Sequence, residues 1–337
     1  MVIKVFKSLE YHFVFDMSNG FFARWGKNKE DDPEFSPFGP EILDLELSTI
    51  CHRGCKFCYK SNMAQGKNMS FDTFKIIFDK FPKQLTQIAF GVGDIDANPD
   101  LWKIMDYCRE KGVIPNITIN GERMTSELYD KLSRVCGAVA VSLYNKNTCY
   151  GAVQELISRG MKQVNIHCLL AHENYSNCLE VLSDRATDKQ LEGLNAVVYL
   201  CLKPKGKRNT FGMVSREDFK TLINKAVATK LPFGFDSCTA SNFLKAVQYK
   251  PNFEQYKIMS EPCESTLFSY FVNVDGIGFP CSFADEKYGG VSIIRCKDFI
   301  KDVWDHQETK QFRMNVMINK DENGCRMCPI YNLEMEE

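Results

Sequence analysis

ILDLELST (residues 42–49) and SFDTFKIIFDKF (residues 70–81) form the stretch that decides the fold. The first is an apolar run of strand length. The second has apolar residues at helical spacing, with Ser70 and Asp72 as candidate caps. This strand-then-helix unit occurs six times between residues 42 and 230. Such a repeat predicts a parallel sheet whose strands are joined by right-handed helical crossovers.

The other units follow the same pattern, and their number limits the architecture. Six units are fewer than the eight of a closed barrel, which leaves an open, partial barrel or a doubly wound sheet, and both bind ligands at the carboxyl ends of their strands. The further strands are expected at 86–93, 114–121, 138–144, 162–170 and 194–203. The further helices are expected near 99–112, 126–135, 147–160, 175–190 and 215–230.

The pattern changes after FGFDSC (233–238), where strands become short and Gly and Pro become frequent. We therefore expect three parts. Residues 1–40 form a β-rich extension, residues 41–235 form the barrel, and residues 236–337 form a small α+β cysteine-rich domain.

Composition narrows the class of protein. The 337 residues are 44% hydrophobic and 25% charged, with a net charge of -1, which is typical of a well-packed globular chain. No basic or acidic patch points to nucleic acid or to an anionic membrane. Charged residues Lys4, Lys7 and Glu10 interrupt the N-terminus before a signal peptide could form, and no window is apolar enough to span a membrane. We expect a cytoplasmic protein.

Fifteen cysteines are many for such a protein. In a reducing compartment, clustered cysteines indicate metal binding or catalysis rather than disulfides. Isolated ones inside apolar segments, such as Cys108, Cys168 and Cys201, are interpreted as small buried hydrophobic residues.

The motif CHRGCKFC directly follows the first barrel strand and places thiols at Cys51, Cys55 and Cys58. Three thiolates on a four-iron cube leave one iron without a protein ligand. The alternatives are a zinc site, for which His52 would be an awkward fourth ligand, and a buried helical face. The central Gly54 and its charged neighbours argue against the buried face.

This CxxxCxxC motif, with the aromatic Phe57 before its last cysteine, resembles the signature of the radical S-adenosylmethionine (radical SAM) superfamily. The resemblance implies a partial (β/α)6 barrel and a [4Fe-4S] cluster whose open iron binds S-adenosylmethionine (SAM). It also implies reductive cleavage of SAM to a 5′-deoxyadenosyl radical that abstracts hydrogen from a substrate. A low-potential electron donor such as flavodoxin or ferredoxin would supply the electron.

The same resemblance suggests which strand ends touch SAM. Gly91, Gly93 and Asp94 stand where the family carries a GGEP-like segment that holds the methionine amino group, although Val92 replaces its second glycine. Asn120 matches a TNG-like end of the third strand.

Three polar residues farther along the sheet share the type and location of groups that contact the ribose and carboxylate. They are Ser142 on the fourth strand, and Asn165 and His167 on the fifth. Asn165 and His167 are two apart and share a face, so the register decides which of them lies beside Ser142.

A second cysteine set consists of Cys263, Cys281, Cys325 and Cys328. Four thiolates suit either zinc or a fully ligated four-iron cluster, and spacing alone does not choose between them. The spacing around Gly276, followed by the CxxC, resembles a SPASM domain in its shortened twitch form. That resemblance implies one auxiliary [4Fe-4S] cluster.

Cys238 belongs to neither set. It is a candidate catalytic residue with three interpretations: an additional cluster ligand, a hydrogen-atom donor to a carbon radical, and an inert buried thiol.

The substrate remains open between a peptide or protein modified by a maturase and a small molecule oxidised by an aminocyclitol-type dehydrogenase. SPASM-like extensions favour the peptide. The short N-terminal segment and a single auxiliary cluster favour the small molecule. A non-catalytic metal-binding protein is the third alternative, and the complete cysteine triad argues against it.

Overall fold

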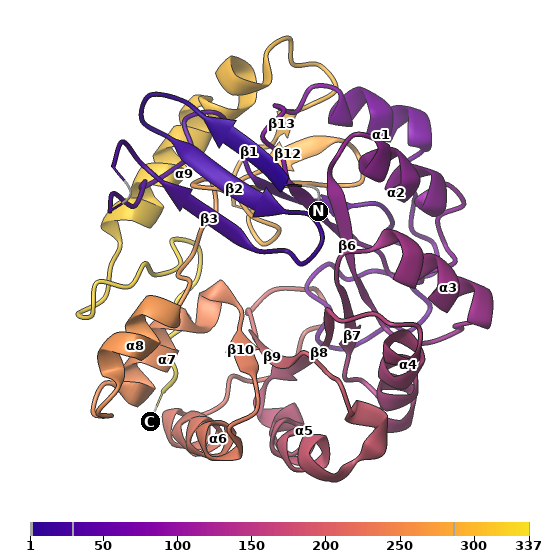
Figure 1. Ribbon diagram of the computed structural model, residues 1–337, viewed down its shortest axis with the longest axis vertical. Helices are drawn as coiled ribbons and strands as arrows, with labels where there is room; N and C mark the ends of the chain where they lie inside the picture. The colour runs from indigo at the N-terminus through magenta and orange to yellow at the C-terminus, as the bar shows by residue number, and fades with distance from the viewer. Residues whose placement is uncertain (1–2, 29, 286, 337) are drawn as a thin grey trace.

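The computed structural model describes residues 3–28, 30–285 and 287–336. The predicted N-terminal extension (1–40) and C-terminal domain (236–337) begin or end with residues 1, 2 and 337, which lie outside the described residues. Figure 1 shows strands enclosed by a ring of helices, with a small three-stranded sheet beside the C-terminal helix. Among the described residues, no helix is long and apolar enough to cross a membrane.

All six predicted strand–helix units are present, each within a few residues of its expected bounds. The strands are β4 (Ile42–Glu46), β5 (Gln87–Gly91), β6 (Ile114–Ile119), β7 (Val139–Ser142), β8 (Val164–Leu170) and β9 (Ala196–Cys201). The helices that follow them are α1 (Phe71–Phe78), α2 (Leu101–Glu110), α3 (Ser126–Val135), α4 (Lys146–Ser158), α5 (Tyr175–Thr187) and α6 (Arg216–Thr229).

The strand order identifies the architecture. The large sheet runs β10-β9-β8-β7-β6-β5-β4-β11-β12-β13, and β4 to β10 are parallel neighbours. The order from β4 to β10 never reverses, as it would at the switch point of a doubly wound sheet. No ladder among the described strands joins the two ends of the sheet. The predicted α/β partial barrel is therefore confirmed.

Two features of this sheet have no clear signal in the sequence. FGFDSC contributes a further parallel strand, β10 (Phe233–Phe235), next to β9. Strand β11 (Ser269–Val272) pairs in parallel with β4 and starts a hairpin of β12 (Ile277–Phe279) and β13 (Val291–Ser292). The C-terminal segment therefore continues the barrel sheet, and the domain boundaries at 40 and 235 stay predictions.

The N-terminal strands form a separate antiparallel sheet that packs on the C-terminal helix α9 (Gln307–Ile318), as Figure 1 shows. Phe13 and Phe15 are fully buried in one apolar cluster with Phe312 and Val316. The strands are β1 (Ile3–Lys7), β2 (His12–Asp16) and β3 (Phe22–Trp25), and the remaining α-helices are α7 (Ala240–Val247) and α8 (Phe253–Met259).

Local chemistry explains why the units begin where they do. The Ser70 hydroxyl accepts a hydrogen bond from the Thr73 amide at 3.2 Å and caps α1, while Asp72 lies in the first turn. Along β4, Leu43 and Leu45 are buried in the main hydrophobic core, so Asp44, between them in the pleat, lies on the inner face of the barrel.

Candidate active site

The predicted cysteine triad lies in the loop that leaves the carboxyl end of β4. Burial raises the pKa of the Cys51 and Cys55 thiols. The charge of the Cys58 thiolate raises both pKa values further, and the charge of the Cys51 thiolate raises the pKa of Cys55. The three thiols therefore lie in one loop within electrostatic reach of one another, and their role as cluster ligands stays a prediction.

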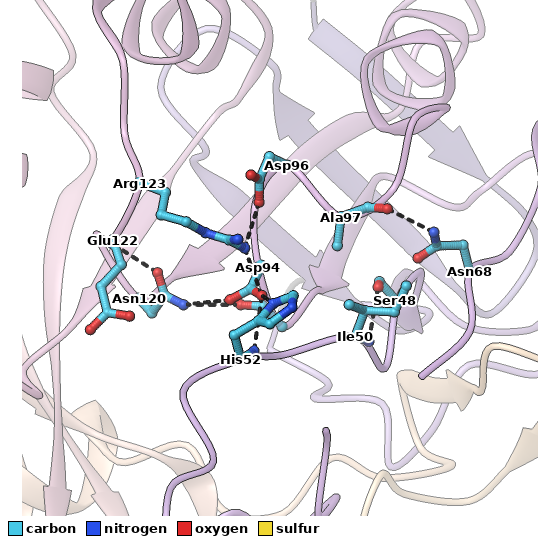
Figure 2. Close-up of polar contacts among 11 residues, drawn as sticks. Ser48, Ile50, His52, Asn68, Asp94, Asp96, Ala97, Asn120, Glu122 and Arg123 are labelled. Atoms are coloured by element: carbon cyan, nitrogen blue, oxygen red, sulfur yellow. Dashed lines mark hydrogen bonds and ion pairs between the residues drawn. The ribbon is translucent and has the colours of Figure 1, made fainter. Parts of the chain in front are cut away.

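Asp94, just after β5, holds this loop in place. Its carboxylate accepts hydrogen bonds from the backbone amide of His52 at 3.0 Å and contacts the His52 Nδ1 at 2.7 Å. Arg123 Nη2 lies 2.6 Å from the same carboxylate, and Asn120 Nδ2 lies 3.4 Å from it (Figure 2). Only 4% of the Asp94 side chain is exposed, whereas Asp96, the other partner of Arg123, is 46% exposed.

These contacts set the charge of Asp94. Burial alone would raise the pKa of Asp94, but the hydrogen bonds from His52 and the charge of Arg123 lower it below its ordinary value. The carboxylate is ionised and directed to the residue after Cys51. The family resemblance implies that Asp94 contacts the methionine amino group of SAM. In the structure its oxygens are engaged by the loop, and the cofactor contact stays a prediction.

Gly93 is where β5 approaches the cysteine loop. A Cβ at Gly93 would lie 2.1 Å from the Ile50 carbonyl oxygen and 2.6 Å from the Cys51 Cβ, so no side chain fits there. A Cβ at Gly91 would lie 3.6 Å or more from its neighbours, which is an ordinary contact. Of the two predicted glycines, Gly93 is the one that the packing requires.

A cavity of about 480 Å³ opens beside the loop and is lined by Cys55, Phe57, Glu122 and Phe211, among others. The rings of Phe57 and Phe211 are 5.1 Å apart, and a second contact of 5.5 Å joins Phe57 to Tyr144. Phe57 and Phe211 thus form an aromatic part of the cavity wall. Phe57 therefore lies where the sequence places it, beside the thiols.

The register of the sheet settles how the other polar candidates lie. Ser142 pairs with His167 across β7 and β8, so His167, rather than Asn165, stands beside Ser142. Asn165 lies near the amino end of β8, and its side chain accepts a hydrogen bond from Asn195 at 2.8 Å. Burial lowers the pKa of His167 to about 4, which keeps this imidazole neutral.

The interior of the barrel carries several charges that the sequence does not single out. Lys60 lies 3.5 Å from Glu46 and 3.1 Å from Asp285. The buried Lys203 ammonium lies 2.5 Å from Asp236. The Asp44 side chain shows no ion pair or hydrogen bond among the described residues. It is accessible to water yet surrounded by the barrel, and this partial desolvation raises its pKa to about 6.

An aromatic contact joins the two cysteine regions. Tyr59, the residue after Cys58, places its ring 4.4 Å from that of Phe283. Phe283 is two residues after Cys281, and Tyr59 lies within electrostatic reach of the Cys281 thiol. The loop after β4 therefore packs directly against the segment that carries a C-terminal cysteine. Neither aromatic residue stands out in the sequence.

The structure brings together only part of the second cysteine set. Cys263, Cys281 and Cys328 pack against one apolar cluster, and the charges of Cys281 and Cys328 add to burial in raising the pKa of Cys263 to about 12. Cys325 packs instead in the main barrel core, where it is 4% exposed. Cys238, outside the predicted set, shares a cavity of about 390 Å³ with Cys263 and Cys328.

The arrangement of the thiols bears on the kind of metal group that they could hold. Within the described ranges, no three His, Cys, Asp or Glu side chains are placed to hold one metal ion. A four-iron cube differs because each of its irons binds a different thiolate, so its ligands lie farther apart. All fifteen cysteines are described and none forms a disulfide, which leaves every thiol available.

One family model and several known proteins match parts of this chain. Residues 45–145 match the family model for the radical SAM superfamily. Mycofactocin maturase MftC from Mycobacterium tuberculosis is 28% identical over 96 residues, which are 28% of this chain and 25% of that protein. The MftC of Mycolicibacterium smegmatis is also 28% identical over 96 residues, and the match covers 24% of that protein. The match thus spans about a quarter of these curated relatives.

Solved structures resemble a much larger part of the chain. Streptococcus suis SuiB bound to the precursor peptide SuiA has a TM-score of 0.71 at 12% identity, with 96% of this chain and 93% of that chain covered. The protein anSMEcpe, with bound AdoMet and the Cp18Cys peptide, has a TM-score of 0.61 at 13% identity, with 88% and 93% covered. At these identities the likeness shows a shared fold.

Proposed function

We propose that this protein, whose residues 45–145 belong to the radical SAM superfamily, is an enzyme that starts radical chemistry on a peptide or protein substrate. The observation that carries this proposal is a three-thiol loop at the carboxyl end of β4, fixed by Asp94 and Gly93 and open to a cavity. When bound there, a [4Fe-4S] cluster with one open iron supplies the electron that splits SAM into methionine and a hydrogen-abstracting 5′-deoxyadenosyl radical.

The side chains around the loop have separate tasks in this proposal. Cys51, Cys55 and Cys58 bind the cluster. Asp94 acts as a positioning residue because its carboxylate holds the backbone next to Cys51. Phe57, which is in ring contact with Tyr144 and Phe211, contributes apolar surface next to the thiols.

Three polar residues of the sheet are proposed to contact SAM: Asn120, directly after β6, Ser142, the last residue of β7, and His167, its neighbour in β8. His167 is neutral, so it can accept or donate a hydrogen bond without adding charge. Asn165, deeper in the sheet and bonded to Asn195, is less well placed for that role than the sequence suggests.

An auxiliary [4Fe-4S] cluster, held by Cys263, Cys281 and Cys328 with one further ligand, completes the proposed site. The contact of Tyr59 with Phe283 supports it, because the loop of the first cysteine set then packs against the segment that carries Cys281. Such a cluster would accept an electron from the substrate radical, and a flavodoxin or ferredoxin would reduce the first cluster.

A peptide is the favoured substrate because the relatives named above include a maturase and structures that hold peptides. The charged interior, with Lys60 and Asp44, also suits a substrate rich in polar groups. A small molecule dehydrogenated in the same interior is the second candidate, favoured by the enclosure of Lys203 beside Asp236.

The first test is anaerobic reconstitution of the full chain with iron and sulfide. The wild type is expected to bind about eight irons and to form 5′-deoxyadenosine from SAM and a strong reductant. The triple variant Cys51→Ala/Cys55→Ala/Cys58→Ala should keep about four irons and form none. Cys296→Ala, at a buried thiol outside both sets, is the control and should match the wild type. A triple variant that still cleaves SAM would refute the assignment.

The second test concerns the substrate. The protein is co-expressed with each short open reading frame next to its gene, and the peptides are examined by mass spectrometry. A mass change that needs the intact triad supports a peptide substrate. If every such peptide is unchanged, and a metabolite gives triad-dependent loss of two hydrogens, the dehydrogenase function replaces it.

A further inference from the structure

The segment after β10 carries a thiol toward the second cysteine set. Asp236 fixes this turn because its carboxylate accepts hydrogen bonds from the Cys201 amide at 3.2 Å and the Thr239 hydroxyl at 2.6 Å. The Lys203 ammonium lies 2.5 Å from it. Cys238 is therefore held at the carboxyl edge of the sheet by contacts to both neighbouring segments.

Cys238 faces the same space as two of the predicted ligands. The cavity of about 390 Å³ is lined by Cys238, Cys263 and Cys328, together with Arg326. Arg326 donates a hydrogen bond to the Cys263 carbonyl at 2.8 Å, which ties the Cys328 segment to Cys263. The cavity is thus bounded by thiols from three distant parts of the chain.

Electrostatic contacts agree with this placement and add Cys281. Burial raises the pKa of Cys238, the Lys203 ammonium opposes the rise, and the charges of Asp236, Cys263 and Cys281 add to it. Lys203 would therefore offset negative charge on the Cys238 sulfur. A buried cation beside several thiolates suits an iron–sulfur cluster, which carries net negative charge.

Cys325 belongs to a different environment. Its amide donates to the Asp321 carboxylate at 2.9 Å, and Ser241 on α7 donates to the other oxygen of that carboxylate at 2.6 Å. Burial raises the pKa of Cys325, Asp321 raises it further, and Arg326 and Lys245 oppose the rise. Although the CxxC motif pairs Cys325 with Cys328 in sequence, the chain turns their side chains into different clusters.

We propose that Cys238 is the fourth ligand of the auxiliary cluster, with Cys263, Cys281 and Cys328, and that Cys325 is a structural thiol. This inference rests on the auxiliary cluster of the proposed function. Four thiolates bind all four irons, so the auxiliary cluster has no open iron for substrate. Cys238 is then a metal ligand and does not donate a hydrogen atom to a radical.

The experiment measures the iron that is bound by the auxiliary cluster alone. In the Cys51→Ala/Cys55→Ala/Cys58→Ala background, the full chain is reconstituted and its iron, sulfide and Mössbauer and EPR spectra are measured. About four irons are expected. Adding Cys238→Ala should lower the iron content or give the EPR signal of a three-iron cluster. Adding Cys325→Ala should leave iron and spectra unchanged. Circular dichroism and melting temperature show that each variant folds.

The outcomes separate the two levels of the proposal. A background variant that binds no iron refutes the auxiliary cluster itself. If the background binds iron and Cys238→Ala keeps an unaltered four-iron spectrum, Cys238 is not a ligand. Loss of iron in a folded Cys325→Ala variant also overturns the inference, because it returns Cys325 to the ligand set.

Discussion

Replacing Asp94 with alanine tests whether one carboxylate holds the cysteine loop. The change removes the acceptor of the His52 amide and the partner of Arg123. A hydrogen bond to a charged group contributes about 1.5–3 kcal/mol. The Arg123 side chain is 45% exposed, so its pairing adds only about 0.2–1 kcal/mol. We expect the free energy of unfolding to fall by about 2–4 kcal/mol.

Asp96→Ala is the matched control because Asp96 pairs with the same arginine at 2.7 Å but is exposed. It should lower the free energy of unfolding by under about 1 kcal/mol. Urea denaturation of both variants measures the difference, and iron retention after reconstitution shows whether the loop is affected. Asp94→Asn keeps one acceptor oxygen and should lie between the two.

The dependence on pH provides a further check of the same reasoning. The pKa of Asp94 is lowered in the folded protein, so its contribution is complete above the unfolded value of about 3.9 and is lost as pH falls through the folded value. The gap in unfolding free energy between wild type and Asp94→Ala should be constant from pH 6 to 8 and shrink below pH 4. A gap no larger than that of Asp96→Ala at pH 7 would refute the positioning role.

Three other predictions follow from packing and burial. Gly93→Ala should abolish binding of the catalytic-cluster iron, since its Cβ would overlap the Ile50 carbonyl, whereas Gly91→Ala should bind iron normally in the same assay. Desolvation raises the pKa of Asp44 to about 6. Its contribution to the free energy of unfolding is therefore greatest below pH 4 and is lost as the pH rises through 6. Asp44→Asn should abolish this dependence of stability on pH, as measured by denaturation from pH 4 to 7. Phe312→Ala should cost about 3–5 kcal/mol by leaving a cavity under the N-terminal sheet, while the exposed Met314→Ala should change stability by under about 0.5 kcal/mol, both read by urea denaturation.

The sequence reveals the features that depend on neighbours along the chain. Apolar periodicity and a Ser70 cap place the first strand and helix to within a few residues, and the same signals locate the five units that follow. The cysteine triad from Cys51 to Cys58 is also recognisable in the sequence, because its chemistry depends on the spacing of three thiols within one loop. These signals lie within short windows, so no knowledge of distant contacts is needed to read them.

The tertiary structure decides which distant groups meet. Strand β11 lies next to β4 although more than 200 residues separate them, and the register alone sets His167 beside Ser142. Arg123, which reaches Asp94 from a left-handed residue, has no sequence signal. Likewise the CxxC spacing groups Cys325 with Cys328, whereas packing separates them and brings Cys238 to the cavity. The direction of a side chain depends on packing against the whole fold, which short-range periodicity does not contain.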